Sequence, residues 1–209
     1  DKTLAKEYQT LVGQLPGSPN RVSIRTASRD WQKLIISASG NRTLPRLYLY
    51  DRSLDQPSLS LLFESYRDAQ PEWIADPQAI SYPARDGLTI PGYLTLPNDV
   101  AAKNLPTVVF PHGGPYARDT DHFDPWVQFF SARGYAVLQP NYRGSHGYGS
   151  EFLRAGFQQW GMKMQDDLDD GLAWLITQGI SDPARVCMVG GSYGCLLYTS
   201  DAADEVDRG

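Results

Sequence analysis

An α/β fold, preceded by a region of short antiparallel strands, is expected from this sequence. Three continuous apolar runs predict strands buried on both faces, which are typical of parallel sheets: Val108 to Phe110, Tyr135 to Leu138 and Val186 to Val189. Helical patterns lie between these runs, and alternation of strand and helix is the pattern of α/β proteins. A chain of 209 residues is long enough for one sizeable core or for parts of two domains.

Before this region, residues 1–75 are expected to form short β-strands separated by turns. The expected strands cover residues 34–38, 47–50 and 59–63, and the turn-forming tripeptide Ser39-Gly40-Asn41 follows the first of them. Strands spaced so closely indicate a meandering antiparallel sheet, as in a propeller blade or a sandwich. No internal repeat is clear in so short a stretch, so the pattern leaves both architectures open.

The stretch from Pro71 to Pro77 predicts a boundary, with a second domain over residues 76–194. Near its start, apolar and polar side chains alternate over residues 88–96, which predicts a half-buried strand. Two helices are predicted further on, over residues 123–133 and 162–178. The second has an apolar stripe formed by Met164, Leu168, Leu172 and Leu175, and an acidic group expected to be a solvated face rather than a metal site: Asp166, Asp167, Asp169 and Asp170.

The composition does not favour a nucleic-acid, membrane or metal partner. The net charge is −5 without a basic run, and no apolar stretch approaches the roughly 18 to 20 residues of a membrane helix. Neither Cys187 nor Cys195 has metal-type spacing, and Cys187 is expected to be buried and unreactive. No metal and no cofactor are therefore expected. The chain starts at Asp1 without an initiator Met, which is consistent with a processed chain or a fragment, and compartment and oligomeric state stay open.

The strongest chemical signal is the pentapeptide Gly190-Gly191-Ser192-Tyr193-Gly194, directly after the buried run that ends at Val189. It is the G-x-S-x-G pattern, in the strand-to-turn context of the nucleophile in an α/β-hydrolase. The serine must lie on a sharp turn with its Oγ exposed, and Gly190 and Gly194 leave room for the neighbouring strand and helix. Ser192 is therefore predicted to be a nucleophile. The competing interpretation is a glycine-rich turn that happens to hold a serine.

A second signal is His112-Gly113-Gly114-Pro115, directly after another buried run. In α/β-hydrolases an H-G-G turn at this place supplies a backbone N–H to the oxyanion hole, and the residue after the nucleophile, here Tyr193, supplies the other. An ordinary loop between a strand and a helix is the alternative interpretation.

His112 is expected to be structural rather than the catalytic base. The triad order of this fold is serine, then acid, then histidine, whereas His112, His122 and His146 all precede Ser192. His122 and His146 are expected to be exposed. Without a later histidine and acid, Ser192 would have no general base, so the chain as given is expected to be inactive. It is also expected to aggregate, because the later strands of the sheet would be missing.

Several strings together resemble the prolyl oligopeptidase family of serine peptidases, most closely its acylaminoacyl-peptidase and dipeptidyl-aminopeptidase-like branch. The resemblance covers most of residues 80–194, and the strand-rich part before it is similar to the last stretch of that family's β-propeller. The strings that carry it are Tyr82 to Gly87, Tyr93 to Pro97, His112 to Pro115, Arg133 to Val137, Asn141 to Ser145, Trp160-Gly161 and Gly190 to Gly194.

This resemblance implies a serine peptidase that acts on short peptides, with a propeller that restricts entry by size. Carried over by position, Ser192 would be the nucleophile, and the backbone N–H groups of Gly114 and Tyr193 would form the oxyanion hole. His112, Gly113, Gly190 and Gly194 would shape the motifs. Arg143, in the family's R-G-S turn, would be a buried structural ion-pair partner rather than a catalyst.

Residues 195–209 depart from the family pattern, which continues with a small-residue, apolar helix. Here four acids follow within fifteen residues, and burial would penalise them heavily. Residues 195–204 also equal the translation of a common transposon-type sequencing adapter, Cys-Leu-Leu-Tyr-Thr-Ser-Asp-Ala-Ala-Asp. This tail is therefore expected to be non-native, and the native reading frame is expected to stop near Gly194.

Two other functions stay open at this point. An esterase or lipase-like hydrolase would use the same parts for acyl transfer, although the propeller-like strands favour the peptidase. A non-catalytic binding module built on a dead hydrolase is the other, and the intact serine turn argues against it.

Overall fold

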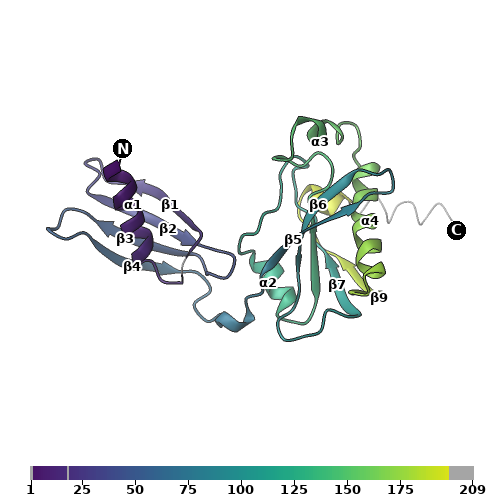
Figure 1. Ribbon diagram of the computed structural model, residues 1–209, viewed down its shortest axis with the longest axis horizontal. Coiled ribbons are helices and arrows are strands. Elements are labelled where there is room, and N and C mark those ends of the chain that lie inside the picture. The colour runs from purple at the N-terminus through teal and green to yellow at the C-terminus, as the bar shows by residue number, and fades with distance from the viewer. Residues whose placement is uncertain (1, 18, 198–209) are drawn as a thin grey trace. The chain divides into compact units, whose positions relative to one another are not determined.

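The computed structural model describes residues 2–17 and 19–197 (Figure 1). The chain divides into two compact units, residues 1–71 with 122–124, and residues 72–121 with 125–209. The separation lies close to the predicted boundary at residues 75/76.

The first unit is an antiparallel sheet with one helix against it (Figure 1). The four strands follow each other in the order β1-β2-β3-β4, each paired with the next, which is the meander expected for a single propeller blade. The elements are α1 (Lys2–Gln14), β1 (Arg21–Ala27), β2 (Lys33–Ser39), β3 (Arg46–Asp51) and β4 (Ser58–Glu64).

The core of this unit lies between α1 and the middle strands. Ile36, Tyr48 and Tyr50 alternate along β2 and β3 and are buried, as the period of two in a strand requires. Leu11 and Leu15, four residues apart, are buried against them.

The expectation that residues 1–75 contain only strands is wrong for residues 2–14, which form α1. Strand β1 was not predicted either, although Val22 and Ile24 alternate with polar residues in its sequence, and five of its seven residues are exposed. It is defined by its hydrogen bonds to β2, with a bulge between Ile24 and Thr26. The strands predicted over residues 34–38, 47–50 and 59–63 correspond to β2, β3 and β4.

The second unit contains a mixed five-stranded sheet in the order β5-β6-β8-β7-β9. Strands β5, β6 and β8 pair antiparallel, while β7 pairs parallel with both β8 and β9. Because β7 lies between the two later strands, the chain leaves it on one side to β8 and returns on the other to β9. The strands are β5 (Pro77–Pro83), β6 (Thr89–Thr95), β7 (Leu105–Val109), β8 (Ala136–Pro140) and β9 (Ser181–Met188).

Helices cover both faces of this sheet. The short α2 (Pro125–Ser131) connects β7 to β8, and the longer α4 (Lys163–Thr177) connects β8 to β9. Val108 of β7 belongs to the core with α2, whereas the next residue, Val109, belongs to the core with α4. Burial on both faces explains why successive residues are apolar at the end of β7, where the run Val108 to Phe110 begins.

The apolar stripe predicted on the second helix lies in the core, where Met164, Leu168 and Leu175 are fully buried. Strand β5 and the short helix α3 (Ser150–Arg154) were not predicted. A short 3-10 helix, η1 (Pro71–Trp73), also precedes β5 in the chain. Strand β9 begins earlier than expected and contains Pro183, which an edge strand tolerates because its outer N–H positions have no partner strand.

The expectation that Cys187 is buried is wrong. Its side chain is exposed, because β9 is the last strand of the sheet in the part of the chain that the structure describes. Of the tail predicted to be non-native, residues 198–209 lie outside the described residues. Residues 195–197 continue a helix that begins at residue 193, and Leu197 is buried in the main core.

Gly171 of α4 provides a test of the packing between this helix and the sheet. A Cβ there would lie 2.6 Å from Cζ and 2.7 Å from the hydroxyl of Tyr82. Tyr82 cannot easily move, because it is 1% exposed and its hydroxyl donates to the Asp167 carbonyl oxygen at 2.9 Å. The substitution Gly171→Ala is therefore expected to lower the free energy of unfolding, measured with urea, by about 1–3 kcal/mol.

The matched control is Gly13→Ala in α1, where a Cβ would meet no atom within 4 Å. It is expected to raise the free energy of unfolding by up to about 1 kcal/mol, because alanine favours helix over glycine. Equal effects of the two substitutions would contradict this account of the packing.

Candidate active site

The candidate nucleophile lies on a sharp turn at the end of β9. The N–H of Val189 donates to the Val109 carbonyl oxygen at 3.0 Å, which extends the pairing with β7 up to the turn. Ser192 then has a φ of 55°, an unfavourable left-handed conformation for a residue with a side chain, and is exposed. Helical backbone begins directly after it, at residue 193. This is the strained strand-to-helix turn that exposes a serine hydroxyl above a sheet.

Close backbone approach explains why glycines flank the serine. A Cβ on Gly190 would lie 2.7 Å from the carbonyl carbon of Gly194. A Cβ on Gly194 would collide with the carbonyl oxygen of Pro111, in the loop after β7. The turn can therefore form beside that loop only without side chains at these two positions.

The His112 loop follows β7, and the serine turn follows β9. Because these strands are neighbours and parallel, both loops leave from the same edge of the sheet. The position of a Cβ on Gly113 is 3.3 Å from the Gly191 carbonyl oxygen and 3.3 Å from the Ser192 Cβ. The structure thus brings together the two motifs that lie about eighty residues apart in the sequence.

Two backbone N–H groups flank this junction. Tyr193 is the first helical residue, so its N–H has no partner within the helix. Gly114 has a φ of 130°, which strongly favours glycine, and a Cβ there would lie 2.6 Å from the amide nitrogens of Tyr116 and Ala117. The assignment of these groups as an oxyanion hole remains a proposal.

His112 is held by residues that follow β8. Its Nε2 lies 2.9 Å from the Ser145 Oγ, and its Nδ1 lies 2.7 Å from the Gly113 carbonyl oxygen. The ring stacks on Tyr142 with centroids 4.4 Å apart, and the Tyr142 hydroxyl donates to the His112 carbonyl oxygen at 2.8 Å. Both ring nitrogens are thus occupied by contacts that shape the loop.

Tyr142 and Ser145 are positioning residues of this loop that the sequence motifs did not identify. The signal was present in the string Asn141 to Ser145, which follows β8, the neighbour of β7 on its other side. All five residues of this string are buried although most of them are polar. Asn141 also binds the loop after Gly114, because its amide exchanges two hydrogen bonds with the Asp119 backbone, at 2.7 and 3.1 Å.

Arg143 is the centre of a buried ion network. Its guanidinium donates to Asp167 at 2.7 Å and to Asp86 at 2.8 Å, and Asp167 is fully buried. The backbone N–H of Arg143 also donates to Asp167, at 2.9 Å. The hydrogen bond from Arg143 holds the pKa of Asp86 well below its ordinary value. These contacts join the loop after β8 to α4 and to the turn between β5 and β6.

The expectation of a solvated acidic face on α4 is therefore wrong for Asp167. Asp166 and Asp170 also have partners, because both pair with Arg85, at 2.7 and 3.0 Å. The helical period places Asp167 on the buried side, one position from Leu168, where only a paired charge can be accommodated. Of the two loop histidines, His146 is exposed as expected, whereas His122 is only partly exposed.

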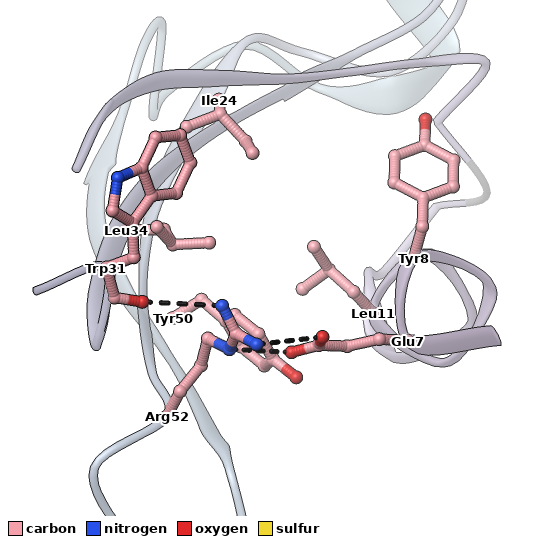
Figure 2. Close-up of a pocket in the computed structure, with 8 residues that line it drawn as sticks. All are labelled: Glu7, Tyr8, Leu11, Ile24, Trp31, Leu34, Tyr50 and Arg52. Atoms are coloured by element: carbon pink, nitrogen blue, oxygen red, sulfur yellow. Dashed lines mark hydrogen bonds and ion pairs between the residues drawn. The ribbon is translucent and has the colours of Figure 1, made fainter. Parts of the chain in front are cut away.

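A separate hollow of about 270 Å³ lies in the first unit, between α1 and the sheet (Figure 2). Leu11, Leu34 and Ile24 form part of its apolar lining. Its charged residues pair with each other, since Arg52 donates to Glu7 at 3.0 Å and to the Trp31 carbonyl oxygen at 3.4 Å (Figure 2). It contains no group arranged like a nucleophile and base.

Among the described residues, no group of three or more His, Cys, Asp or Glu side chains could hold a metal ion. No helix in the described part of the chain is long and apolar enough to cross a membrane.

The sheet, the turn at Ser192 and the adjoining glycine loop define the second unit as part of an α/β-hydrolase domain. The sequence profile of the prolyl oligopeptidase family matches residues 121–207. This match confirms the resemblance to the family that the sequence motifs predict.

Individual relatives agree with this assignment. Dipeptidyl aminopeptidase BIII of Pseudoxanthomonas mexicana is 36% identical over 197 residues, which cover 88% of this chain and 28% of that protein. Dipeptidyl peptidase family member 6 of Caenorhabditis elegans is 33% identical over 217 residues, covering 93% of this chain and 28% of that protein. A crystal structure of puromycin hydrolase aligns with a TM-score of 0.67 and 28% identity, covering 81% of this chain and 26% of the other. The chain therefore spans little more than a quarter of each of these three proteins.

The environment of His112 predicts how stability depends on pH. Burial lowers the pKa of His112 below its ordinary value of 6.5. As the pH falls below about 6.5, His112 therefore becomes protonated in the unfolded chain while it stays neutral in the folded chain. The free energy of unfolding is expected to decrease over this range, down to the lowered pKa of the folded state. Urea unfolding between about pH 7 and pH 5 measures this slope.

The substitution His112→Gln is expected to reduce that slope, and His146→Gln, at an exposed ring, is expected to leave it unchanged. A slope that is the same in all three proteins would remove His112 as its source.

The ion network predicts a strong difference between single and double substitutions. Asp167→Ala leaves the buried Arg143 without its main partner and is expected to lower the free energy of unfolding by about 3–5 kcal/mol. The double substitution Arg143→Met with Asp167→Leu removes both charges and is expected to cost clearly less, by urea unfolding. A double variant at least as unstable as the single one would show that unpaired charge is not the cause.

Proposed function

We propose that this chain is part of a serine peptidase that hydrolyses short peptides through an acyl-enzyme, with Ser192 as its nucleophile. In the first step the Ser192 Oγ bonds to the carbonyl carbon of the scissile peptide, and its proton passes through a general base to the leaving amine. In the second step water attacks the acyl-enzyme, which releases the acid and restores the hydroxyl.

The observation that carries the proposal is the strained, exposed conformation of Ser192 directly beside the Gly113 loop. Five other non-glycine residues have a φ of 50–58°, so the conformation of Ser192 supports the proposal through its place, directly after β9 and against the Gly113 loop. The N–H groups of Gly114 and Tyr193 would stabilise the oxyanion of the tetrahedral intermediate. Each such donor typically contributes about 3 kcal/mol to transition-state stabilisation.

Similarity to a peptidase family supports the reaction, and the names of the two relatives, a dipeptidyl aminopeptidase and a dipeptidyl peptidase, support dipeptidyl substrates as one class to test. Arg143, fully engaged with Asp86 and Asp167, has a structural role in this proposal.

The general base is proposed to be a histidine outside residues 1–197. Within the described residues the Ser192 hydroxyl makes no side-chain hydrogen bond, and His112 is engaged by Ser145 and Gly113. The 209-residue chain is therefore expected to be inactive by itself.

We also propose that residues 195–209 are non-native, so that the natural chain would continue differently after Gly194. The family profile extends to residue 207, which stands against it, whereas the identity of residues 195–204 with a translated adapter supports it. Sequencing the source gene across the codons of Gly190 to Gly209 decides the matter. A continuation with a small-residue helix, and later an acid and a histidine, is the expected result.

The catalytic proposal is tested on the product of the complete reading frame. Hydrolysis of dipeptidyl and N-acyl-aminoacyl p-nitroanilides is measured beside a p-nitrophenyl ester, which separates a peptidase from an esterase. Ser192→Ala is expected to lower kcat by at least about 10³-fold, because the acyl-enzyme can no longer form. Ser60→Ala, an exposed serine of β4, is the control that leaves kcat unchanged. Peptide turnover that survives Ser192→Ala, or robust turnover by the 209-residue chain, would overturn the proposal.

A further inference from the structure

An aromatic hollow of about 780 Å³ opens on the second unit and is lined by Tyr116, Phe157, Gln158 and Trp160. Three of the four lining residues are aromatic and none is charged. Phe157 is 50% exposed and Trp160 is 55% exposed, so two large rings present apolar surface to solvent at the same place. Trp160 belongs to one of the strings that resemble the peptidase family, and no other role of its side chain follows from the sequence.

Two contacts connect this aromatic hollow to the candidate active site. On one side, the Trp160 ring packs edge-on against Tyr193, the residue after the candidate nucleophile, with centroids 5.6 Å apart. Tyr193 is itself fixed, because it is 6% exposed and its hydroxyl donates to the Met164 Sδ at 3.1 Å. Trp160 is therefore held one residue from Ser192.

On the other side, Tyr116 belongs to the glycine loop. It follows Gly114 by two residues, and its ring packs edge-on against Phe157 with centroids 6.1 Å apart. One wall of the hollow, Tyr116, thus comes from the loop that carries the proposed donor Gly114, and the other three lining residues come from the segment between α3 and α4. That segment contacts the residue of the second proposed donor through the Trp160 and Tyr193 rings.

The segment that carries Phe157 and Trp160 is locked in place before any ligand binds. A Cβ on Gly156 would lie 2.6 Å from the Cα of Gly144 and 2.6 Å from the Cε of Met164, so the two loops pack without space between them. Gln158 has a φ of 58°, and the Met162 N–H donates to the Gln159 carbonyl oxygen at 3.2 Å. A preformed hollow binds without the entropy cost of ordering its walls.

We infer that the aromatic hollow is a specificity subsite for an aromatic or large aliphatic side chain of the peptide, adjacent to the scissile bond. This inference rests on the proposed function for the identity of the ligand. Burial of apolar surface on both sides favours such a side chain, and aromatic pairs gain further from edge-on and offset contacts. A lysine or glutamate side chain would lose its hydration among uncharged walls and is disfavoured.

The test measures binding rather than turnover, so that it does not depend on catalysis. The product of the complete reading frame carrying Ser192→Ala is titrated with acetyl-Ala-X-Ala-amide peptides, in which X is Phe, Leu, Ala or Lys, in competition with a fluorescein-labelled Phe peptide followed by anisotropy. The Phe peptide is expected to bind about tenfold more tightly than the Ala peptide, and the Lys peptide no better than the Ala peptide.

Trp160→Ala and Phe157→Ala, each added to the Ser192→Ala background, are expected to reduce the Phe-to-Ala ratio to about two or less and to leave the Ala peptide unchanged. Trp73→Ala, at a tryptophan that is also 53% exposed but lies in η1, is the matched control and keeps the ratio. Circular dichroism establishes that each variant is folded. Placing X on either side of the scissile bond in p-nitroanilide and amide substrates then assigns the subsite to the acyl or the leaving side.

The outcomes separate the two proposals. An absent Phe preference, or a preference that survives both aromatic substitutions in folded protein, overturns the subsite. A preference that both substitutions remove, in a protein whose parent has no Ser192-dependent turnover, supports the subsite and overturns the proposed function. Ser192-dependent turnover without a side-chain preference supports the proposed function and overturns the subsite.

Discussion

The close approach of two backbone turns at the carboxyl edge of β7 and β9 is the constraint on which the rest of the second unit depends. The loop after β7 and the turn after β9 pack so closely that Gly190 and Gly194 leave no space for a Cβ, and a Cβ on Gly113 would lie only 3.3 Å from the serine turn. Since the two strands are parallel neighbours, this contact follows from the topology. It holds Ser192 in a conformation that an isolated peptide would avoid.

A network of buried polar contacts holds the loop after β7 in place. The segment after β8 is buried although it is polar, which is stable only because each group has a partner. Through Tyr142 and Ser145 it orients His112, and through Arg143 it reaches Asp167 on α4 and Asp86 beyond β5. A substitution at any of these residues would therefore alter the conformation of the glycine loop, although none of these residues contacts a substrate in the proposed function.

The same segments that build the reaction centre also leave the apolar surface beside it. Packing of Gly156 against Gly144 fixes the loop that carries Trp160, and Tyr193 supports its ring. Rigid walls around an uncharged hollow can select side chains by size and polarity. Reaction centre and proposed subsite thus share their supporting contacts, so both depend on the packing of α4 against the sheet.

Local patterns in the sequence predicted where the buried strands lie along the chain, the apolar stripe of α4 and the serine turn. Each of these features arises from residues that are neighbours in the sequence. Other features arise only when distant segments meet. Asp167 has the same helical surroundings as Asp166, yet only the approach of Arg143 makes its burial possible. Cys187 lies in an apolar run but is exposed, because β9 pairs on one side among the described residues. The aromatic hollow has no local pattern in the sequence, since Tyr116 and the segment that carries Phe157 and Trp160 meet only in the tertiary structure.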